Sequence, residues 1–476
     1  MQLAKLITHK KIKALHGYRL AFVVLFFCCF STARSQDNSP YSRYGIGDLV
    51  PQTHIINRGM GGISAAYNDF LSLSINFNNP ASYSYFQAPV EPKSKKKITS
   101  GRAILDLGLN FENRTLQEPS STAPKFTANN ALFSYVQIGV PLKNNWGLSF
   151  GLRPVSRISY KIIRNEKLKD PNSGLPIDSA TTLFKGDGGA YLPSVGVGFN
   201  VFQRNTTKGE EKLSVGINGG YLFGKKDYST QRTLHNDTVS YYQANYETKT
   251  SFGSPYFNAG AQYKIPLNKK VSLTLGVYGN WGQKLSASQD IIRETFVFDQ
   301  NQGNLRLDSV SDQQNIKGKI VYPASYTFGF VTEKLPVGTE GGWLLGIDFT
   351  QQNWNQYRFY GQTDQVQNKW ELRVGAQLRP APKRNYFSNV AYRAGFFTGP
   401  DYVKVAGQKL SQFGGSLGLG LPIPTSRQSP NQATLINVAF EYGKRGNNNN
   451  LLKENTFRVS LGFSLSDFWF FKKKYD

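Results

Sequence analysis

The most constraining feature of this sequence is a two-residue alternation of apolar and polar side chains that recurs from about residue 101 onward. In the run Phe457–Leu465, every second residue is aromatic or aliphatic, and the residues between them are polar or glycine. Similar runs occur in Leu105–Glu112, Val195–Asn200 and Val271–Tyr278. Because successive side chains on a strand point to opposite faces, this period predicts strands with one apolar and one polar face.

Fourteen such runs are predicted as strands, and the connections between them alternate in kind. Even-numbered strands end in mostly short turns such as Pro141–Trp146, whereas odd-numbered strands end in mostly longer polar loops, notably Arg164–Lys185 and Ile291–Lys317. Short turns on one side and long loops on the other are typical of bacterial outer-membrane barrels, although an antiparallel sandwich also alternates. The predicted strands cover residues 103–113, 126–140, 145–163, 186–204, 211–231, 241–265, 270–290, 318–333, 341–359, 369–380, 387–400, 410–423, 432–443 and 454–466.

The first 35 residues predict export. Five basic residues precede the apolar run Leu20–Phe30, and small residues follow it, which is the pattern of a secretory signal peptide cleaved before Gln36. A lipoprotein attached through Cys28 or Cys29 is the alternative interpretation. Both cysteines of the chain lie in this segment, so a mature chain without it has no disulfide and no cysteine metal ligand.

The net charge of +25 falls to +19 in the mature chain, because six positive charges lie before residue 36. Such a charge suggests nucleic acid. Export and the scatter of basic residues through turns argue against that partner. The dense runs Lys93–Lys97 and Lys472–Lys474 indicate either solvated faces or attraction to anionic lipid headgroups. Outer-membrane lipids and lipopolysaccharide are therefore predicted partners.

A glycine-rich segment, Asn57–Phe86, precedes the strands and predicts a compact, turn-rich plug. Asn79 is suited to cap a helical turn over residues 81–86, with Pro80 at its first position, where a missing N–H costs nothing. A segment this small cannot bury a core alone, so the strands must surround it. The predicted plug residues are Arg58, Gly59, Gly61, Gly62, Asn79 and Pro80.

This pattern, Arg-Gly-Met-Gly-Gly followed by Ala-Ala-x-Asn-Asp and Asn-Pro-Ala, resembles the hatch of FadL-family outer-membrane barrels and their PorV-like relatives of the Bacteroidota type. The resemblance implies a 14-stranded antiparallel barrel in the outer membrane with an N-terminal periplasmic plug containing short helical turns. The expected organisation is a signal peptide at 1–35, a plug at 36–100, a barrel at 101–471 and a periplasmic tail at 472–476. The Phe-rich last strand resembles the signal read by the outer-membrane insertion machinery, a further expected partner.

Tryptophan positions predict aromatic girdles at the two membrane interfaces. Three tryptophans fall at the expected periplasmic ends of strands and three toward the outer ends. The first group is Trp146, Trp343 and Trp469, and the second is Trp281, Trp354 and Trp370.

The sequence predicts no catalytic centre. The mature chain has two histidines, His54 and His235, and neither stands in a recognisable catalytic or metal-binding motif. Asp187 and the loop 298–312 have the composition of calcium ligands, but solvated turns are the simpler interpretation. We predict no cofactor and no metal.

Charged residues at inward strand positions are the candidate lumen site. Four arginines, Arg153, Arg157, Arg373 and Arg393, are suited to hold an anionic head group whose tail lies on apolar hatch residues. The alternative is that they form ion pairs that fill the lumen against the plug, because a buried charge needs a partner.

Pro154 and Pro193 fall at similar heights on neighbouring predicted strands. A proline inside a strand removes a ladder hydrogen bond, so the pair indicates either two bulges or a lateral gate between these strands. The FadL resemblance implies uptake of small hydrophobic molecules. It also implies that the ligand leaves the lumen through such a gate. The alternative function is that of a PorV-like, non-enzymatic barrel subunit in an outer-membrane protein secretion or assembly complex.

Overall fold

The computed structural model describes residues 39–68, 73–86, 101–119, 124–169, 172–236, 241–299, 303–424 and 432–468. The predicted signal peptide, the last part of the plug interval with its lysine run, Trp469 and the C-terminal tail lie outside these residues.

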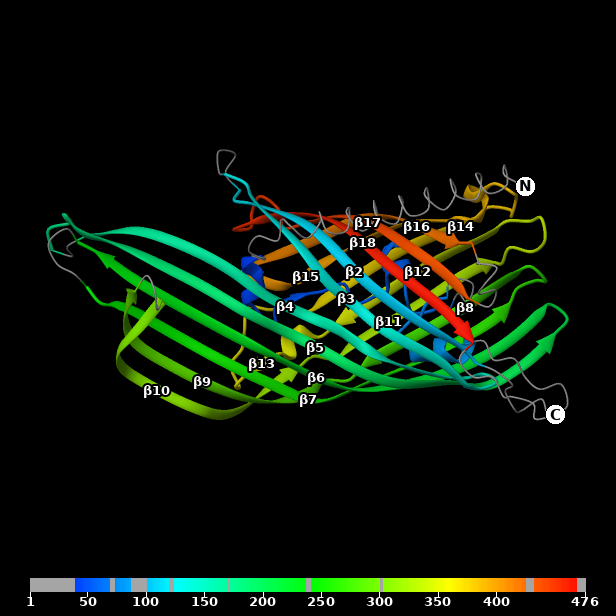
Figure 1. Cartoon of the computed structure of the whole chain (residues 1–476), viewed down its shortest axis with the longest axis horizontal. Coiled ribbons are helices and arrows are strands. Elements are labelled where there is room, and N and C mark those ends of the chain that lie inside the picture. The colour runs from blue at the N-terminus through cyan, green and yellow to red at the C-terminus, as the bar shows by residue number, and fades with distance from the viewer. Residues whose placement is uncertain are drawn as a thin grey trace, which may run out of the picture.

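Fourteen antiparallel strands form a closed barrel, as predicted (Figure 1). Two of them are interrupted, so that β8 continues as β9 and β10 continues as β11. The last strand closes the barrel by pairing with β2 from Lys453–Gln117 to Phe468–Arg102. The wall strands are β2 (Arg102–Gln117), β3 (Phe126–Lys143), β4 (Trp146–Lys169), β5 (Pro176–Thr206), β6 (Gly209–His235), β7 (Gln243–Pro266), β8 (Val271–Asn280), β9 (Gln283–Asp299), β10 (Gly303–Tyr322), β11 (Ser325–Lys334), β12 (Gly342–Gln352), β14 (Lys369–Arg379), β15 (Ala391–Val405), β16 (Gln408–Ile423), β17 (Ala433–Arg445) and β18 (Lys453–Phe468).

The wall is much taller on one side than on the other. Strands β4–β7, β9 and β10 extend in Figure 1 well beyond the ends of β12 and β14–β18. The predicted loops Arg164–Lys185 and Ile291–Lys317 are wrong, because most of each is paired strand. Apolar alternation is weak in these extensions, and ion pairs such as that of Glu166 on β4 with Arg232 on β6, at 2.9 Å across the intervening β5, join their strands.

The outward face carries an exposed apolar band with aromatic residues near its edges. Trp146 stacks on Phe199, and Trp281 and Trp370 are about half exposed, as predicted for interfacial girdles. Trp354 is different. It is 1% exposed because η4 (Trp354–Gln356) folds inward, where its ring packs against that of Tyr402 at 4.3 Å. No helix among the described residues is long and apolar enough to cross a membrane.

The plug lies inside the barrel and spans much of its height. Its elements are η1 (Pro40–Arg43), β1 (Asp48–Leu49), α2 (Ile55–Arg58) and η3 (Pro80–Tyr85). η3 packs near the short turns, with Tyr83 against Gly147, and the periplasmic placement of the plug stays a prediction. The first elements reach the outer half of the lumen because β1 pairs with Arg157 and Ser156 of β4. Elsewhere, β13 (Arg358–Phe359) pairs with β10, and η5 (Tyr386–Asn389) forms the turn after β14.

The local structure of the plug agrees with the sequence pattern. The side chain of Asn79 accepts a hydrogen bond from the Ala81 N–H, and Pro80 begins the short helix that it caps. Gly61 and Gly62 have φ angles of 66° and 90°, the left-handed region that favours glycine.

Where the plug comes closest to the wall, the wall residues are glycines, which have no side chain. Twelve of the fourteen wall strands each place a glycine whose added Cβ would lie within 3.3 Å of a plug atom. At seven sites of this glycine belt the nearest plug atom belongs to the backbone, and at five it belongs to a side chain, so the plug is held closely all round. The belt consists of Gly108, Gly139, Gly147, Gly198, Gly216, Gly260, Gly276, Gly346, Gly375, Gly395, Gly418 and Gly462.

We expect Gly61→Val to loosen the plug. A Cβ at Gly61 would lie 2.7 Å from the carbonyl oxygens of Phe396 and Val374, which adds overpacking to backbone strain, a cost of about 3 kcal/mol or more. The thermal midpoint of the purified barrel should fall, and large antibiotics should enter mutant cells faster.

Gly174→Val is the matched control. Gly174 has a similar φ of 69°, but nothing lies within 4 Å of its added Cβ, so the variant tests strain without the clash. Equal permeability of the two variants at equal barrel levels would show that the plug does not seal the lumen.

Candidate functional site

Arg58, predicted as a plug residue, is a buried tie between plug and wall. Its guanidinium donates to the carbonyl oxygens of Thr53 and Pro51, both at 2.9 Å, and to the Ser134 hydroxyl at 2.7 Å. A further hydrogen bond reaches Asn110 of β2 at 2.5 Å. Burial lowers the pKa of Arg58 to about 10, which still leaves the group charged at neutral pH.

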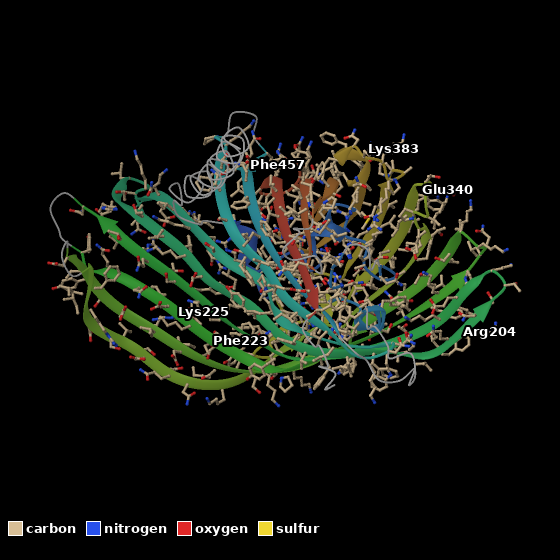
Figure 2. All side chains as sticks on the ribbon, turned by 45° about the vertical axis from the view of Figure 1, so that its right-hand side comes forward. Arg204, Phe223, Lys225, Glu340, Lys383 and Phe457 are labelled. Carbon is tan, nitrogen blue, oxygen red and sulfur yellow. The ribbon has the colours of Figure 1, made fainter. Side chains whose placement is uncertain are left out.

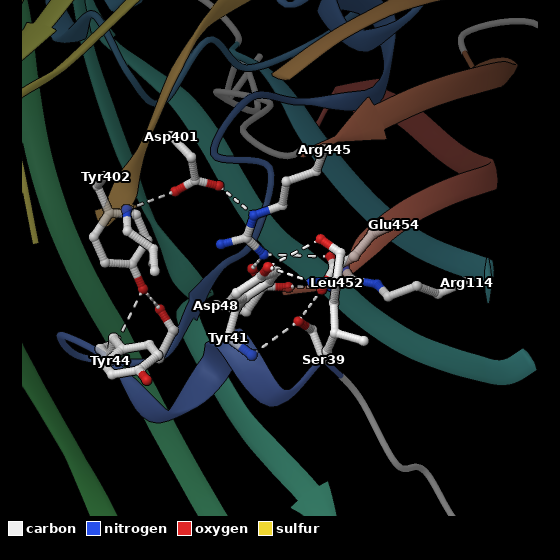
Figure 3. A network of polar contacts seen from close by, with 12 residues as sticks. Ser39, Tyr41, Tyr44, Asp48, Arg114, Asp401, Tyr402, Arg445, Leu452 and Glu454 are labelled. Atoms are coloured by element: carbon white, nitrogen blue, oxygen red, sulfur yellow. Dashed lines mark hydrogen bonds and ion pairs between the residues drawn. The ribbon is translucent and has the colours of Figure 1, made fainter. Parts of the chain in front are cut away.

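A network of ion pairs fastens the outer part of the plug (Figure 3). Asp48 of β1 accepts from Arg114 at 2.8 Å and from Arg445 at 2.9 Å, so one plug carboxylate joins β2 to β17. Arg445 also pairs with Asp401, and Glu454 binds both arginines, at 3.3 and 3.4 Å. The pKa of Asp48 is lowered: burial alone would raise it, but the two guanidinium groups outweigh burial.

The sequence analysis did not predict this network. The alternation of inward and outward residues along the strands nevertheless indicates part of it. Arg114 continues the inward series Asp106, Glu112 on β2, and Glu454 continues the series that contains Arg458 on β18. No alternating pattern indicates the position of Asp48, because this residue precedes the glycine-rich segment and lies outside the predicted strands.

The four predicted lumen arginines have separate surroundings. Arg153 donates to Asn78 of the plug at 2.7 Å and lies over the Phe77 ring. Arg373 binds Glu371 at 2.7 Å, and Arg393 donates to Gln377 and Asn437 of the wall, at 2.6 and 3.0 Å. Arg157 lies beside Asp48 in the β1–β4 ladder. The four do not surround one space, and their role as a head-group site stays a prediction.

A cavity of about 210 Å³ lies between the plug and strands β14–β18. About half of its lining residues are charged, and several of these belong to the networks described above. Glu112 and Arg458 pair nearby at 2.6 Å. Such a space accommodates water or a small polar solute. The charged lining includes Asp48, Arg58, Arg114, Arg373, Arg445 and Glu454.

Pro154 and Pro193 are level, as predicted, since Pro193 opposes Leu152 and Pro154 opposes Tyr191. The ladder between β4 and β5 runs continuously past both prolines, with a bulge at Val155. The lateral gate between these two strands stays a prediction.

The wall separates instead between β3 and β4. These strands pair only between Val136–Leu152 and Lys143–Trp146, and beyond Leu152 the described part of β4 pairs with β5 on one side. On its other side β1 takes the position of a neighbouring strand, with the Val50 N–H donating to the Val155 carbonyl at 3.2 Å. The plug therefore occupies this β3–β4 seam.

Asp48→Asn should destabilise the plug strongly. The change leaves two buried guanidinium groups with less compensation, and breaking a buried pair in this way costs about 3 kcal/mol or more. The ion pairs of Asp48 stabilise the fold above the carboxyl's unfolded pKa and are lost as pH falls through its lower folded pKa. Wild type should therefore lose stability in acid, and Asp48→Asn should have a shallower acid dependence, measured by thermal unfolding in detergent.

Glu340→Gln is the control, because Glu340 also binds two cations, Lys270 at 2.6 Å and Lys334 at 2.8 Å, but is 46% exposed. Its loss should cost under about 1 kcal/mol. Equal effects of the two variants would show that the Asp48 network is not holding the plug.

Known proteins resemble this barrel in fold. A Pseudomonas aeruginosa FadL homologue aligns with a TM-score of 0.50 at 14% identity, over 90% of this chain and 100% of the homologue. The P. putida toluene transporter TodX aligns with a TM-score of 0.46 at 14% identity, over 89% of this chain and 99% of that one. Identities this low show the fold alone, and the predicted Bacteroidota type stays a prediction.

No curated protein matches the sequence. The BamG family model matches residues 12–476, nearly the whole chain. The chain is therefore a FadL-like outer-membrane β-barrel that belongs to the BamG family.

Proposed function

We propose that this protein is a non-conducting barrel subunit of an outer-membrane protein assembly complex. The observation that carries the proposal is the filled lumen: backbone contact with the glycine belt and buried ion pairs fasten the plug along the barrel's height. The cavity that remains is small and charged. A channel for hydrophobic molecules needs a continuous apolar path.

Two further features support a scaffold role. The family name, BamG, hints at the outer-membrane biogenesis machinery. The tall wall of β4–β7, β9 and β10 also offers a large paired surface outside the apolar band, where a partner can bind without the lumen being opened. A subunit of this kind needs a stable outer surface and no moving gate.

Purification in a mild detergent tests the proposal directly. We expect a larger outer-membrane protein to co-elute at fixed stoichiometry, and the purified barrel to give no conductance in planar bilayers. Gly61→Val serves as the positive control for conductance, because it should unseat the plug. A lone wild-type barrel that conducts would contradict the proposal.

Uptake of small hydrophobic molecules is the second candidate, and one observation favours it. The β3–β4 seam parts the wall near the outer edge of the apolar band and is closed by the plug segment around Leu49, not by a neighbouring wall strand. A ligand that displaced this segment would reach the bilayer sideways. The gate at Pro154 and Pro193 is the competing exit.

Two engineered disulfides, made in separate variants that both carry Ser156→Cys, distinguish these two exits. Leu49→Cys with Ser156→Cys would lock the plug against β4, since the two residues are ladder partners. Ser156→Cys with Ala190→Cys would lock β4 to β5 in the same way. Uptake of toluene into proteoliposomes should be blocked by the first lock if the ligand leaves through the β3–β4 seam, and by the second if it leaves at the prolines.

Reduction of the disulfide restores uptake in either case and serves as the internal control. Toluene flux that equals that of protein-free vesicles in every sample would remove the uptake candidate and leave the scaffold proposal standing.

A further inference from the structure

On the outward face of β4–β6, apolar side chains give way to charged side chains at one height along the barrel. On β5 the outward residues from Tyr191 to Val201 are apolar, an 11-residue stretch that matches the length of a strand crossing a bilayer. The Tyr191 ring lies 6.1 Å from the Phe223 ring of β6 and marks the outer edge of this band. The next outward residue of β6 is Lys225, which Figure 2 shows beside Phe223 on the convex face.

Two lysines stand directly opposite each other above this edge. Lys161 of β4 and Lys185 of β5 are ladder partners, and both are exposed. They share the outward face because Tyr160, which precedes Lys161, packs inward against Gly186. Like charges placed opposite each other on neighbouring strands are unfavourable unless an anion lies between them.

The nearby carboxylates are already engaged. Asp187 and Asp227 pair with Lys225 at 2.5 and 3.4 Å. Glu247 on the next strand pairs with Lys249 at 3.2 Å. Within the described residues, no carboxylate forms an ion pair within 4 Å with either member of the lysine pair. Counted with Lys225 and Lys249, four ammonium groups stand against three carboxylates here, an excess of one positive charge.

The lysine pair borders a hollow of about 420 Å³ in the convex face. The hollow is lined by the lysine pair, by the paired carboxylates Asp187, Asp227 and Glu247, and by Ser159 and Ser229, whose hydroxyls are suited to sugar hydroxyls. A hollow of this size accommodates a phosphorylated sugar.

Its height above the membrane points to one source for that sugar. Lys185 lies six residues beyond Tyr191, which is about 20 Å along the strand and about 15 Å above the apolar edge at the usual strand tilt. Phosphorylated sugar heads of the outer leaflet occupy this zone, whereas the acyl chains would contact the apolar band below.

We propose that Lys161 and Lys185 form a binding site for the phosphate-bearing sugar head of an outer-leaflet glycolipid. The phosphate lies between the two ammonium groups and relieves their repulsion, Ser159 and Ser229 donate to the sugar, and the aromatic edge at Tyr191 and Phe223 carries the acyl chains. The site is on the outer wall and is independent of what the lumen does.

The test compares Lys161→Gln/Lys185→Gln with Lys208→Gln/Lys269→Gln, a control that removes two exposed lysines from the short turns at the other end of the barrel. Binding of diphosphorylated lipid A to each purified barrel in detergent is measured by native mass spectrometry. Wild type and control should bind equally, and the Lys161/Lys185 variant about thirtyfold more weakly, at about 1 kcal/mol for each lysine. The difference should shrink as salt is raised.

Thermal midpoints of the two double variants should match, which shows that both barrels fold. Binding of lipid A by the Lys161/Lys185 variant at the control's affinity would overturn the proposal. Inorganic phosphate that binds wild type as tightly as lipid A would also overturn it, by showing a free-anion site rather than a lipid site.

Discussion

Contact between backbone and backbone, across a belt of wall glycines, is the constraint on which the rest of this structure depends. A barrel of fourteen strands encloses a lumen that side chains alone do not fill, so a second layer of chain must enter it. Because the wall glycines let the plug approach closely, polypeptide rather than water fills this part of the lumen. At Gly395 an added Cβ would lie 2.0 Å from the Gly61 nitrogen, so neither partner can be larger.

Buried charge then fixes the plug in one arrangement. Asp48 joins arginines of two wall strands that are not neighbours, and Asp348 of β12 accepts from the N–H groups of Ser64 and Ala65, at 2.6 and 2.8 Å. Such contacts add little net stability over apolar packing, but they penalise any shifted plug because each displaced partner leaves a charge uncompensated. Glycines therefore provide the fit, and ion pairs provide the register.

Most of the wall could be predicted from the sequence, because alternation in Phe457–Leu465 or Leu105–Glu112 reports directly which residues meet lipid. The signal is weak in the extensions of β4, β5, β9 and β10, which therefore look like loops. It fails at Trp354, whose inward position depends on contacts with Tyr402 from a distant strand. The full Asp48 network could not be predicted for a similar reason: the alternation along the strands places Arg114 and Glu454 inward, but the ion pairs that link them with Asp48 join segments up to about 400 residues apart.

The FadL-like fold does not by itself decide the function of this barrel. A fold supports many functions, and what decides among them is the chemistry of the site that the fold encloses. Here the inner surface presents glycine and paired charge to the plug, together with an apolar cluster that includes Leu192, Phe252 and Trp354, whereas a second set of large apolar residues faces outward. A plug held this closely is the feature on which the proposed scaffold role rests.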